Sequence, residues 1–422
     1  MERPRKTVAV IGAGIVGVST AIWCLRDGHD VILIDRKGPA EGASHGNGGV
    51  LASNGIIPVS VPGLLRSVPS LLVGRDQPLF LKWQYLPRLV PWLTRFLGHA
   101  NANDVRRRAA AMAGIVGDSL AEHQDLARDT GAEKWICPAD YVFLYRDRPH
   151  FEGDSLGWQI RAEHGYTWQE LEGAALRAYD PAFGPSITFG VRCPNHGRIS
   201  DPGRYVKDLA MHAESQGARL LIGEVTDVVQ ENGHVTGLRV GGETVRCDSV
   251  VLAAGAWSGP LARKLGVQVP MESERGYHLE LWEPTIMPRS PVMIAAAKFV
   301  ATPMDGRLRL AGIVEFGGLD APPSRAPLRL LERQIRKAMP GIAWKDTVEW
   351  MGHRPSVADS TPLIGPVPGV AGALMAFGHD HVGLTGGPRT GRLVSQLVAG
   401  RKPNLDLTPY SPARYAIARR PT

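Results

Sequence analysis

The hydrophobic positions near the start of the chain follow a strand pattern, then a helix pattern, then a strand pattern again. Residues 7–11 are an unbroken apolar run rich in β-branched side chains, as in a strand buried on both faces of a parallel sheet. A helical stretch extends to Leu25, and a second apolar run from Asp30 to Ile34 ends at Asp35. This order predicts a β–α–β unit of an α/β domain.

The turn between the first strand and the helix is GAGIVG, residues 12–17, which has the spacing GxGxxG. In this setting Gly12 permits the turn, Gly14 lets the backbone approach a pyrophosphate, and Gly17 lets helix and strand pack closely. Asp35 stands at the end of the second strand, where an acid accepts hydrogen bonds from a ribose. The pattern predicts a dinucleotide site. The alternative is a glycine-rich turn in an unrelated α/β sheet.

Further along, prolines and capping residues divide the chain into shorter elements. Six prolines between residues 58 and 91 predict short helices and loops, because proline interrupts a helix. Ser200 and Asp201 are predicted caps of a helix at 202–214. The other predicted elements are a helical stretch over 103–132, strand pieces including 141–145, and a run of strands from 219 to 253 with turns at 231–233 and 241–242.

Residues 82–108 combine aromatic and cationic side chains. Trp83, Tyr85, Trp92 and Phe96 alternate with Lys82, Arg88 and Arg95, and Arg106, Arg107 and Arg108 follow. Such a segment suits a membrane interface, where rings lie at headgroup depth and cations meet anionic lipid. We favour the alternative, a helical pair that faces the protein core with its cations in water. The consecutive arginines fit an acidic partner or a solvated helix face equally well.

The composition excludes several classes of protein. With 44% hydrophobic and 21% charged residues, the 422-residue chain has ordinary globular usage, unlike a disordered or fibrous chain. Its formal net charge of +7 suggests an acidic partner such as anionic lipid, nucleic acid or a carboxylate substrate, yet no nucleic-acid-binding module is recognised. No signal peptide and no membrane-spanning apolar run are found, so a cytoplasmic protein is expected. The cysteines have no CxxC spacing, which predicts neither a zinc site nor a disulfide framework; they are Cys24, Cys137, Cys193 and Cys247.

Five stretches, taken in order, resemble the flavoprotein superfamily of D-amino acid oxidase and glycine oxidase, and most closely D-amino acid dehydrogenases. They are GAGIVGVSTA at 12–21 with Asp35-Arg36, GASHGNGG at 42–49, EVTDV at 224–228 with VVLAAGAWS at 250–258, GHRPSVADSTPLIGP at 352–366 and GHDHVGLTGGPRTG at 378–391. The resemblance covers nearly the whole chain. It implies an α/β fold with two interleaved domains. One is a Rossmann-like FAD-binding domain of three layers, two sheets and one layer of helices (ββα), and the other is an α+β substrate domain built on a mostly antiparallel sheet.

The resemblance implies FAD as the cofactor, bound noncovalently because no cysteine stands near the motif at the flavin end, and it implies no metal. Glycines beside the flavin fit this, since a backbone without side chains can approach a flat ring closely. His45 could instead be a packed loop residue. The residues that the resemblance assigns to the cofactor are Gly12, Gly14, Ile15, Val16, Gly17, Asp35, Arg36, Ser44, His45, Gly46, Asn47, Gly48, Val225, Ala254, Gly255, Trp257, Gly383, Leu384 and Thr385.

The carboxylate-binding arginine of the family matches Arg354, in the sequence Gly-His-Arg-Pro at 352–355. A guanidinium suits this task because it can hold a carboxylate through two parallel hydrogen bonds. A structural arginine at a strand end is the alternative. Arg275 is a second candidate for the same role, although its neighbour Glu274 makes a structural ion pair equally plausible.

Four more residues are candidates for shaping the substrate pocket. Of Tyr277 and His278, only one can point inward, because successive side chains of a strand face opposite sides, and we favour Tyr277. His353 and His379 stand near the motifs at the flavin end, as does His381. No catalytic base is assigned, since hydride transfer from a neutral amine does not require one.

The implied activity is the FAD-dependent oxidative deamination of D-amino acids in amino acid catabolism, with D-proline or D-hydroxyproline among the substrates considered. A hydride leaves the α-carbon for the flavin, and the electrons pass to a quinone or another acceptor. A quinone acceptor would bring the protein to anionic lipid at the cytoplasmic face of the inner membrane. The rival interpretations are an oxygen-using enzyme like glycine or sarcosine oxidase, and a noncatalytic FAD-carrying subunit of a larger complex. The oligomeric state stays open.

The expected domain organisation is interleaved. The FAD-binding domain is assigned to residues 1–57, 191–268 and 351–422, and the substrate domain to residues 58–190 and 269–350.

Overall fold

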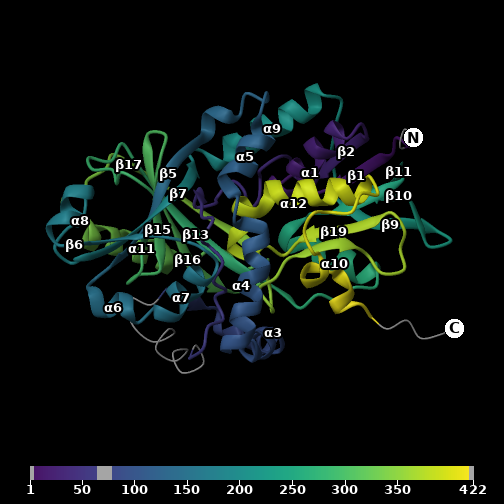
Figure 1. Cartoon of the computed structure of the whole chain (residues 1–422). Helices are drawn as coiled ribbons and strands as arrows, with labels where there is room; N and C mark the ends of the chain where they lie inside the picture. The colour runs from purple at the N-terminus through teal and green to yellow at the C-terminus, as the bar shows by residue number, and fades with distance from the viewer. Residues whose placement is uncertain (1–3, 64–77, 418–422) are drawn as a thin grey trace.

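The computed structural model describes residues 4–63 and 78–417 and places two large sheets side by side (Figure 1). The first sheet has six strands in the order β18-β19-β12-β1-β2-β8, all parallel to their neighbours except β18. Its strands are β1 (Thr7–Ile11), β2 (Asp30–Asp35), β8 (Arg219–Ile222), β12 (Ser249–Leu252), β18 (Leu363–Pro366) and β19 (Ala373–Phe377). Strands from the start, the middle and the end of the chain therefore build one sheet. The predicted N-terminal β–α–β unit is confirmed.

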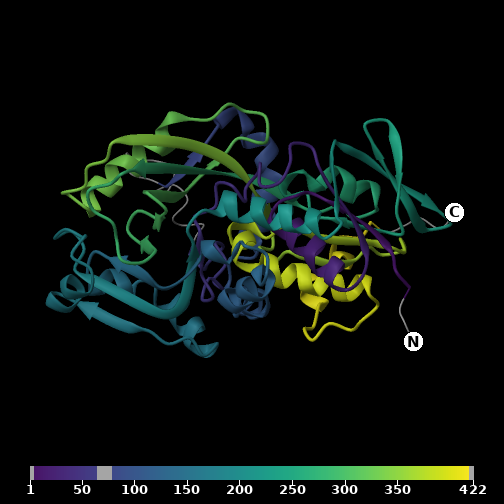
Figure 2. The ribbon, with the colours of Figure 1, turned by 90° about the horizontal axis from the view of Figure 1, so that it is seen from above.

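Alternate side chains of the six-stranded sheet face two different layers. Val8 and Val10 of β1 pack with helices α1 (Ile15–Arg26), α9 (Pro202–Ser215) and α12 (Gly383–Val398). Ala9 and Ile11 face the antiparallel sheet of β9 (Val225–Glu231), β10 (His234–Val240) and β11 (Glu243–Arg246). This alternation follows from the period of two along a strand. The predicted ββα layering is confirmed, and Figure 2 shows α1 and α12 lying together although they are far apart in sequence.

The second sheet has ten strands and is mostly antiparallel. Its main path runs β17-β13-β16-β15-β14-β5-β7-β3, with β4 paired to β16 and β6 paired to β7. Among the described strands of this second sheet, only the pairs β14 with β5 and β16 with β4 are parallel. Helix α11 (Arg325–Ala338) buries Leu328, Leu331 and Ile335 against β13 and β16. The strands are β3 (Val50–Leu51), β4 (Leu79–Leu81), β5 (Ile136–Tyr145), β6 (Gln169–Glu172), β7 (Phe189–Ile199), β13 (Met271–Trp282), β14 (Val292–Ile294), β15 (Phe299–Met304), β16 (Arg307–Phe316) and β17 (Asp346–Val357).

The chain passes from one sheet to the other at positions that differ from the expected domain boundaries. Strand β7 continues past residue 191 and β17 past residue 351, both within the ten-stranded sheet. The helical stretch expected over 103–132 is two helices, α4 (Ala102–Val116) and α5 (Ser119–Ala127), and both pack against α12 of the six-stranded sheet. We keep two interleaved domains as a proposal, with α4 and α5 on the six-stranded side. The smaller helices are α6 (Arg148–Glu152), α7 (Ser155–Glu163), α8 (Ala174–Tyr179) and α10 (Ser258–Lys264).

Helix α3 (Leu86–Gly98) corrects the prediction that prolines confine this region to short pieces, because Pro91 lies inside its thirteen residues. The helix persists because its apolar face is buried: Trp92 stacks on Phe96 with ring centroids 4.7 Å apart, and its indole donates to the Ser356 carbonyl at 3.1 Å. The core-facing interpretation is confirmed for these two rings, whereas Trp83 is 65% exposed. Pro69 lies outside the described residues.

The consecutive arginines of α4 do not share one solvated face. Arg108 is 3% exposed and donates to the Ser60 hydroxyl at 2.7 Å and to the His99 carbonyl. Arg106 and Arg107 form surface ion pairs with Glu163 and Asp104, respectively. Arg108 is therefore a structural residue, which the run of three arginines did not reveal.

Candidate active site

A cavity of about 1790 Å³ lies where the two sheets meet. On one side it follows the carboxyl ends of β1, β2 and β12, where Gly12, Asp35 and Ala254 contribute to its wall. On the other side it reaches Glu274 of β13 and Arg354 of β17. Ligands of open parallel sheets bind in the crevice outside the carboxyl ends of the strands. The position of the cavity matches this rule.

The glycines of the GxGxxG turn are required by its geometry. Gly12 has a φ of +107°, and a Cβ there would lie 2.4 Å from the Ala253 carbonyl oxygen. A Cβ on Gly17 would lie 1.8 Å from the Gly12 carbonyl oxygen. Gly17 does not line the cavity, and its role is the close packing of α1 on the turn. Gly14 lines the cavity, so the backbone is bare where a phosphate group would approach.

The amino end of α1 and the side chain of Asp35 are held by local hydrogen bonds. The Ser44 hydroxyl accepts from the Ile15 N–H at 2.9 Å. The Asp35 carboxylate accepts from the N–H groups of Ala13 at 2.9 Å, Lys37 at 2.8 Å and Gly38 at 3.1 Å. These bonds fix Asp35 in the cavity wall and leave acceptor capacity on a carboxylate that has about four lone-pair sites. This geometry fits a ribose.

In the opposite part of the cavity, glycine residues leave the backbone of the wall without side chains. A Cβ on Gly46 would overlap the ring of Trp350, at 1.9 Å, so this segment lies flat on the indole. Gly383 and Thr385, at the start of α12, complete the wall on the other side. These surfaces fit a flat ring such as the flavin. The predicted cofactor residues that line the cavity are Gly12, Gly14, Ile15, Val16, Asp35, Arg36, Ser44, Gly46, Asn47, Gly48, Val225, Ala254, Gly255, Trp257, Gly383, Leu384 and Thr385.

His45 does not line the cavity with these residues. Its ring lies against Gly203, where a Cβ would meet Nδ1 at 2.7 Å, and its centroid is 6.0 Å from that of Trp350. Burial, followed by the charge of Arg309, lowers the pKa of His45. The expectation that this side chain borders the cofactor is therefore wrong, and the alternative of a packed loop residue applies.

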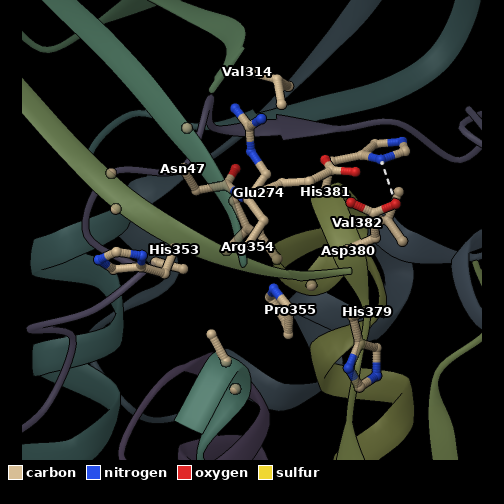
Figure 3. A pocket seen from close by; sticks show the side chains of 18 of the residues that line it. Asn47, Glu274, Val314, His353, Arg354, Pro355, His379, Asp380, His381 and Val382 are labelled. Carbon is tan, nitrogen blue, oxygen red and sulfur yellow. Dashed lines mark ion pairs between the residues drawn. The ribbon is translucent and has the colours of Figure 1, made fainter. Parts of the chain in front are cut away.

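Arg354 points into the cavity, and its guanidinium has no bonding partner among the described residues (Figure 3). No hydrogen bond or ion pair joins the Arg354 side chain to any other residue in the described part of the chain. The guanidinium lies over Gly276, where a Cβ would be 2.6 Å from Cζ. Because β13 and β17 pair with Glu274 opposite Arg354, Gly276 is the next residue on the same face. The glycine thus makes the room that Arg354 occupies.

Arg275 and Tyr277 face the other side of β13, so the expectation that they contribute to the pocket is wrong. The Arg275 side chain is fully buried, forms an ion pair with Glu315 at 3.0 Å, and donates to the Ala321 carbonyl at 2.8 Å. The Tyr277 hydroxyl donates to Glu315 at 2.7 Å. An ion pair does hold Arg275, but its partner is Glu315 across the sheet and not Glu274.

The three predicted histidines occupy three different settings. His278 lies behind the cavity wall, stacked on Trp350 at 5.1 Å, with its Nδ1 3.1 Å from the Gly46 carbonyl. His353 lines the cavity and hydrogen-bonds Ser273 at 2.8 Å. His379 also borders the cavity, but its ring is hydrogen-bonded to Thr390 at 2.9 Å and lies apart from Arg354 (Figure 3). Burial lowers the pKa of His353 and of His379 to about 4, so both rings are neutral near pH 7.

The structure adds Glu274 and Asp380, which the sequence did not assign to the site, and places with them His381, which the sequence located only near the flavin-end motifs. An isolated bridge pairs Ser356 of β17 with His379, which sets the short helix η4 (Asp380–Val382) beside β17 and β13. The side chains of Glu274, Asp380 and His381 then meet at the cavity wall (Figure 3). The signal available in the sequence was the aspartate between the two histidines of GHDHVG. In the structure this aspartate, Asp380, has a φ of +50°. Their contact depends on tertiary packing.

No cysteine lines the described cavity, and no group of three or more metal-ligating side chains occurs among the described residues. The four cysteines are free thiols, and three of them are buried. Within residues 4–63 and 78–417, no helix has both the length and the apolar character needed to cross a membrane.

Comparison with known proteins agrees with this geometry. A D-amino-acid oxidase of Bradyrhizobium diazoefficiens is 38% identical over 416 residues, which cover 97% of this chain and 98% of that protein. A D-amino acid dehydrogenase of Methylobacterium nodulans is 30% identical over 423 residues, covering 97% and 99% of the two chains. Among solved structures, glycine oxidase from Geobacillus kaustophilus superposes with a TM-score of 0.75 at 22% identity, over 96% of this chain and 98% of that one.

L-proline dehydrogenase from P. horikoshii superposes with a TM-score of 0.74 at 18% identity and 98% coverage of both chains, which shows the shared fold. The family model described as DAO, FAD dependent oxidoreductase, matches residues 7–397. The residues that line the cavity fit FAD, as described above. The chain belongs to the DAO family and is an FAD-dependent oxidoreductase.

Proposed function

We propose that this enzyme oxidises D-amino acids at the bond between the α-carbon and the amino nitrogen. The observation that carries the proposal is the unengaged guanidinium of Arg354 in the same cavity as the glycine-lined surfaces that fit FAD. The names of the relatives, a D-amino-acid oxidase and a D-amino acid dehydrogenase, support the D configuration. FAD, when bound, accepts the hydride that leaves the α-carbon.

The residues of the chain position the substrate for this reaction. Arg354 binds the substrate carboxylate through two parallel hydrogen bonds, which fixes the direction of the α-carbon. Gly276 keeps that guanidinium in place because any side chain there would displace it. Once hydride and amine proton have left, the product is an imino acid. A linear imino acid then reacts with water to give ammonia and a 2-oxo acid, whereas a cyclic one keeps its ring.

Anaerobic mixing with a panel of D- and L-amino acids tests the proposal. We expect one or more D-amino acids to bleach the absorbance of the oxidised flavin, and the L-enantiomers of the same residues to leave it unchanged. The panel should include D-proline and D-hydroxyproline, because a cyclic imino acid product keeps its ring. If no D-amino acid bleaches the flavin, the proposal fails and a noncatalytic FAD-carrying subunit becomes the better interpretation.

We propose a quinone or another electron carrier as the acceptor, with molecular oxygen as the second candidate. The oxidase name of the relative at 38% identity favours oxygen, and the dehydrogenase name of the relative at 30% identity favours a carrier. After anaerobic reduction by substrate, mixing with air-saturated buffer or with a soluble quinone analogue separates the two. Faster reoxidation by the quinone analogue supports a dehydrogenase.

The exposed face of α3 supports contact with an anionic membrane surface. Arg88 and Arg95 are exposed and make no hydrogen bond or ion pair with any described residue, and Trp83 lies exposed just before the helix. We expect the protein to co-sediment with anionic liposomes at low salt and to stay in solution at high salt. The double substitution Arg88→Gln with Arg95→Gln should weaken binding by about 2 kcal/mol, at about 1 kcal/mol for each cation.

A matched control for this measurement is the pair Arg219→Gln and Arg246→Gln, which removes two exposed arginines at β8 and β11. If both double variants lose liposome binding equally, the attraction follows net charge and α3 is not the contact surface.

A further inference from the structure

Beside Arg354, the cavity contains a carboxyl pair that the oxidation as proposed above does not use. Glu274 extends from β13 and Asp380 from η4, and their side chains meet at the cavity wall (Figure 3). Both residues line the cavity although they are only 4% and 8% exposed. In Figure 3 the Glu274 carboxyl is turned toward Asp380 and His381, away from the guanidinium of Arg354.

Asp380 is an unusual residue in two respects. Its φ of +50° is a left-handed conformation that few residues other than glycine adopt, although aspartate tolerates it. Neither of its buried carboxylate oxygens accepts a hydrogen bond from an N–H or hydroxyl group of the described residues. Its ion pair with His381, at 3.6 Å, is longer than a hydrogen bond. A buried carboxylate in this state has unused capacity to accept hydrogen bonds from a ligand.

The charged groups around the pair come from three elements. Burial, followed by the charge of Asp380, raises the pKa of Glu274, and the Ser356 hydroxyl donates to its carboxyl at 3.0 Å. Burial opposes the ionisation of Asp380, but His381, Arg354 and Glu274 together hold its pKa below the ordinary value. Asp380, followed by Glu274, raises the pKa of His381. These directions favour a neutral Glu274 carboxyl and an ionised Asp380 carboxylate near pH 7.

We propose that Glu274 and Asp380 form the binding site for the substrate's ammonium group, next to the site of Arg354 for its carboxylate. This inference rests on the proposed function and specifies how the substrate is held. Strand pairing sets Glu274 directly opposite Arg354, yet no ion pair within 4.0 Å joins them. Arg354 lies on β17, and the carboxyl pair comes from the neighbouring strand β13 and from η4. The cation matches the substrate carboxylate, and the pair matches the ammonium group on the same α-carbon.

This arrangement favours amines that have at least two N–H donors when protonated. A primary ammonium group has three N–H donors, and the pair supplies acceptors for two of them. One N-methyl group leaves two donors, enough for both acceptors, whereas two N-methyl groups leave one donor and a buried acceptor without a partner, which costs more than the bond itself contributes. We therefore assign D-amino acids with a primary or secondary amino group as the preferred substrates, ahead of N,N-dimethylated ones.

The test compares the binding of 2-aminoisobutyrate and isobutyrate to the FAD-loaded enzyme by titration calorimetry. The two compounds share one carbon skeleton, and the first cannot be oxidised because its α-carbon carries no hydrogen. We expect the wild type to prefer the amino compound, and Glu274→Gln and Asp380→Asn each to lower this preference by about tenfold to a hundredfold. Asparagine tolerates the positive φ at residue 380, and glutamine is isosteric with glutamate.

The matched control is Glu272→Gln, a second buried carboxyl of β13 that does not line the described cavity. It should keep the wild-type preference. Either of the two site variants that retains its yellow FAD is sufficient for the test. If it binds the two compounds in the wild-type ratio, the inference is wrong.

A pH series adds a signature that a merely structural role would not produce. The charged form of Glu274 appears as pH rises through its raised pKa, so a second negative charge develops in the pair. Loss of the proton from His381 acts in the same direction. The preference for 2-aminoisobutyrate should therefore increase from pH 7 toward pH 9, and this increase should be smaller in Glu274→Gln. An identical increase in the variant would remove Glu274 from the site.

Turnover distinguishes failure of this inference from failure of the proposed function. The ratio of kcat/KM for D-alanine to that for N,N-dimethyl-D-alanine should be high in the wild type and about tenfold lower in Asp380→Asn. If D-alanine and other D-amino acids reduce the flavin but the ratio is the same in both proteins, only the ammonium site is wrong. If no D-amino acid reduces the flavin of the wild type, the proposed function itself is wrong.

Discussion

Replacing Arg354 with alanine should lower kcat/KM for the best D-amino acid by about two to four orders of magnitude. This decrease in kcat/KM corresponds to the loss of two charge-assisted hydrogen bonds, each of which contributes about 1.5–3 kcal/mol. The effect should appear mainly in KM, because the carboxylate is bound in the ground state as well as in the transition state. Steady-state kinetics with the acceptor in excess measures both parameters.

The FAD absorbance of the same variant is the control for folding. Arg354 extends over Gly276 in the substrate part of the cavity, so its removal should leave the protein yellow. Arg354→Lys keeps the charge but loses the planar fork, and it should fall between the wild type and alanine. An unchanged KM in Arg354→Ala would show that another group binds the carboxylate.

Replacing Gly17 with alanine should abolish FAD binding and destabilise the protein by more than about 3 kcal/mol, the upper end of the usual cost of overpacking. The Cβ would lie 1.8 Å from the Gly12 carbonyl oxygen, and a backbone atom cannot move aside as a flexible side chain can. Helix α1 would have to separate from the turn that borders the pyrophosphate site. Flavin content after purification and the midpoint of thermal unfolding report the two effects.

Gly98→Ala is the matched control for the Gly17 substitution. It lies in the last turn of α3, and a Cβ at residue 98 would have no atom within 4 Å. Alanine has a higher helix propensity than glycine, so this variant should be as stable as the wild type or slightly more stable. If Gly17→Ala retains FAD and the wild-type unfolding midpoint, the close packing of α1 on the turn is not required for the fold.

The parts of the fold that the sequence predicted well are those that depend on local pattern. The strand at Thr7–Ile11, helix α9 with its Asp201 cap and the strand at Ser249–Leu252 all occur where the hydrophobic period and the capping residues placed them. Helix α3 was not predicted as one element because its stability comes from burying Trp92 and Phe96, which outweighs Pro91. That contribution is tertiary and is absent from the local sequence.

The candidate site was predicted only in part, for a similar reason. We expected one of Tyr277 and His278 to face the pocket, but neither lines it. The phase of β13 puts Glu274 and Gly276 on the cavity side and Tyr277 on the other, and His278 packs on Trp350 behind the cavity wall. The carboxyl pair joins residues more than a hundred positions apart, through the bridge between Ser356 and His379. Family motifs located Arg354, whereas Glu274 and Asp380 required the three-dimensional structure.

The position of β1 between β12 and β2 has a consequence for the synthesis of the protein. The N-terminal β–α–β unit leaves the ribosome first, but β12, β19 and α12, which complete its sheet and cover α1, follow much later in the chain. At ordinary rates of translation this delay lasts roughly 20 to 70 s. During that time β1 has an unpaired edge, which can associate with other chains. We therefore expect the sheet around β1 to be completed only after β19 and α12 have been synthesised, and FAD to bind after that point.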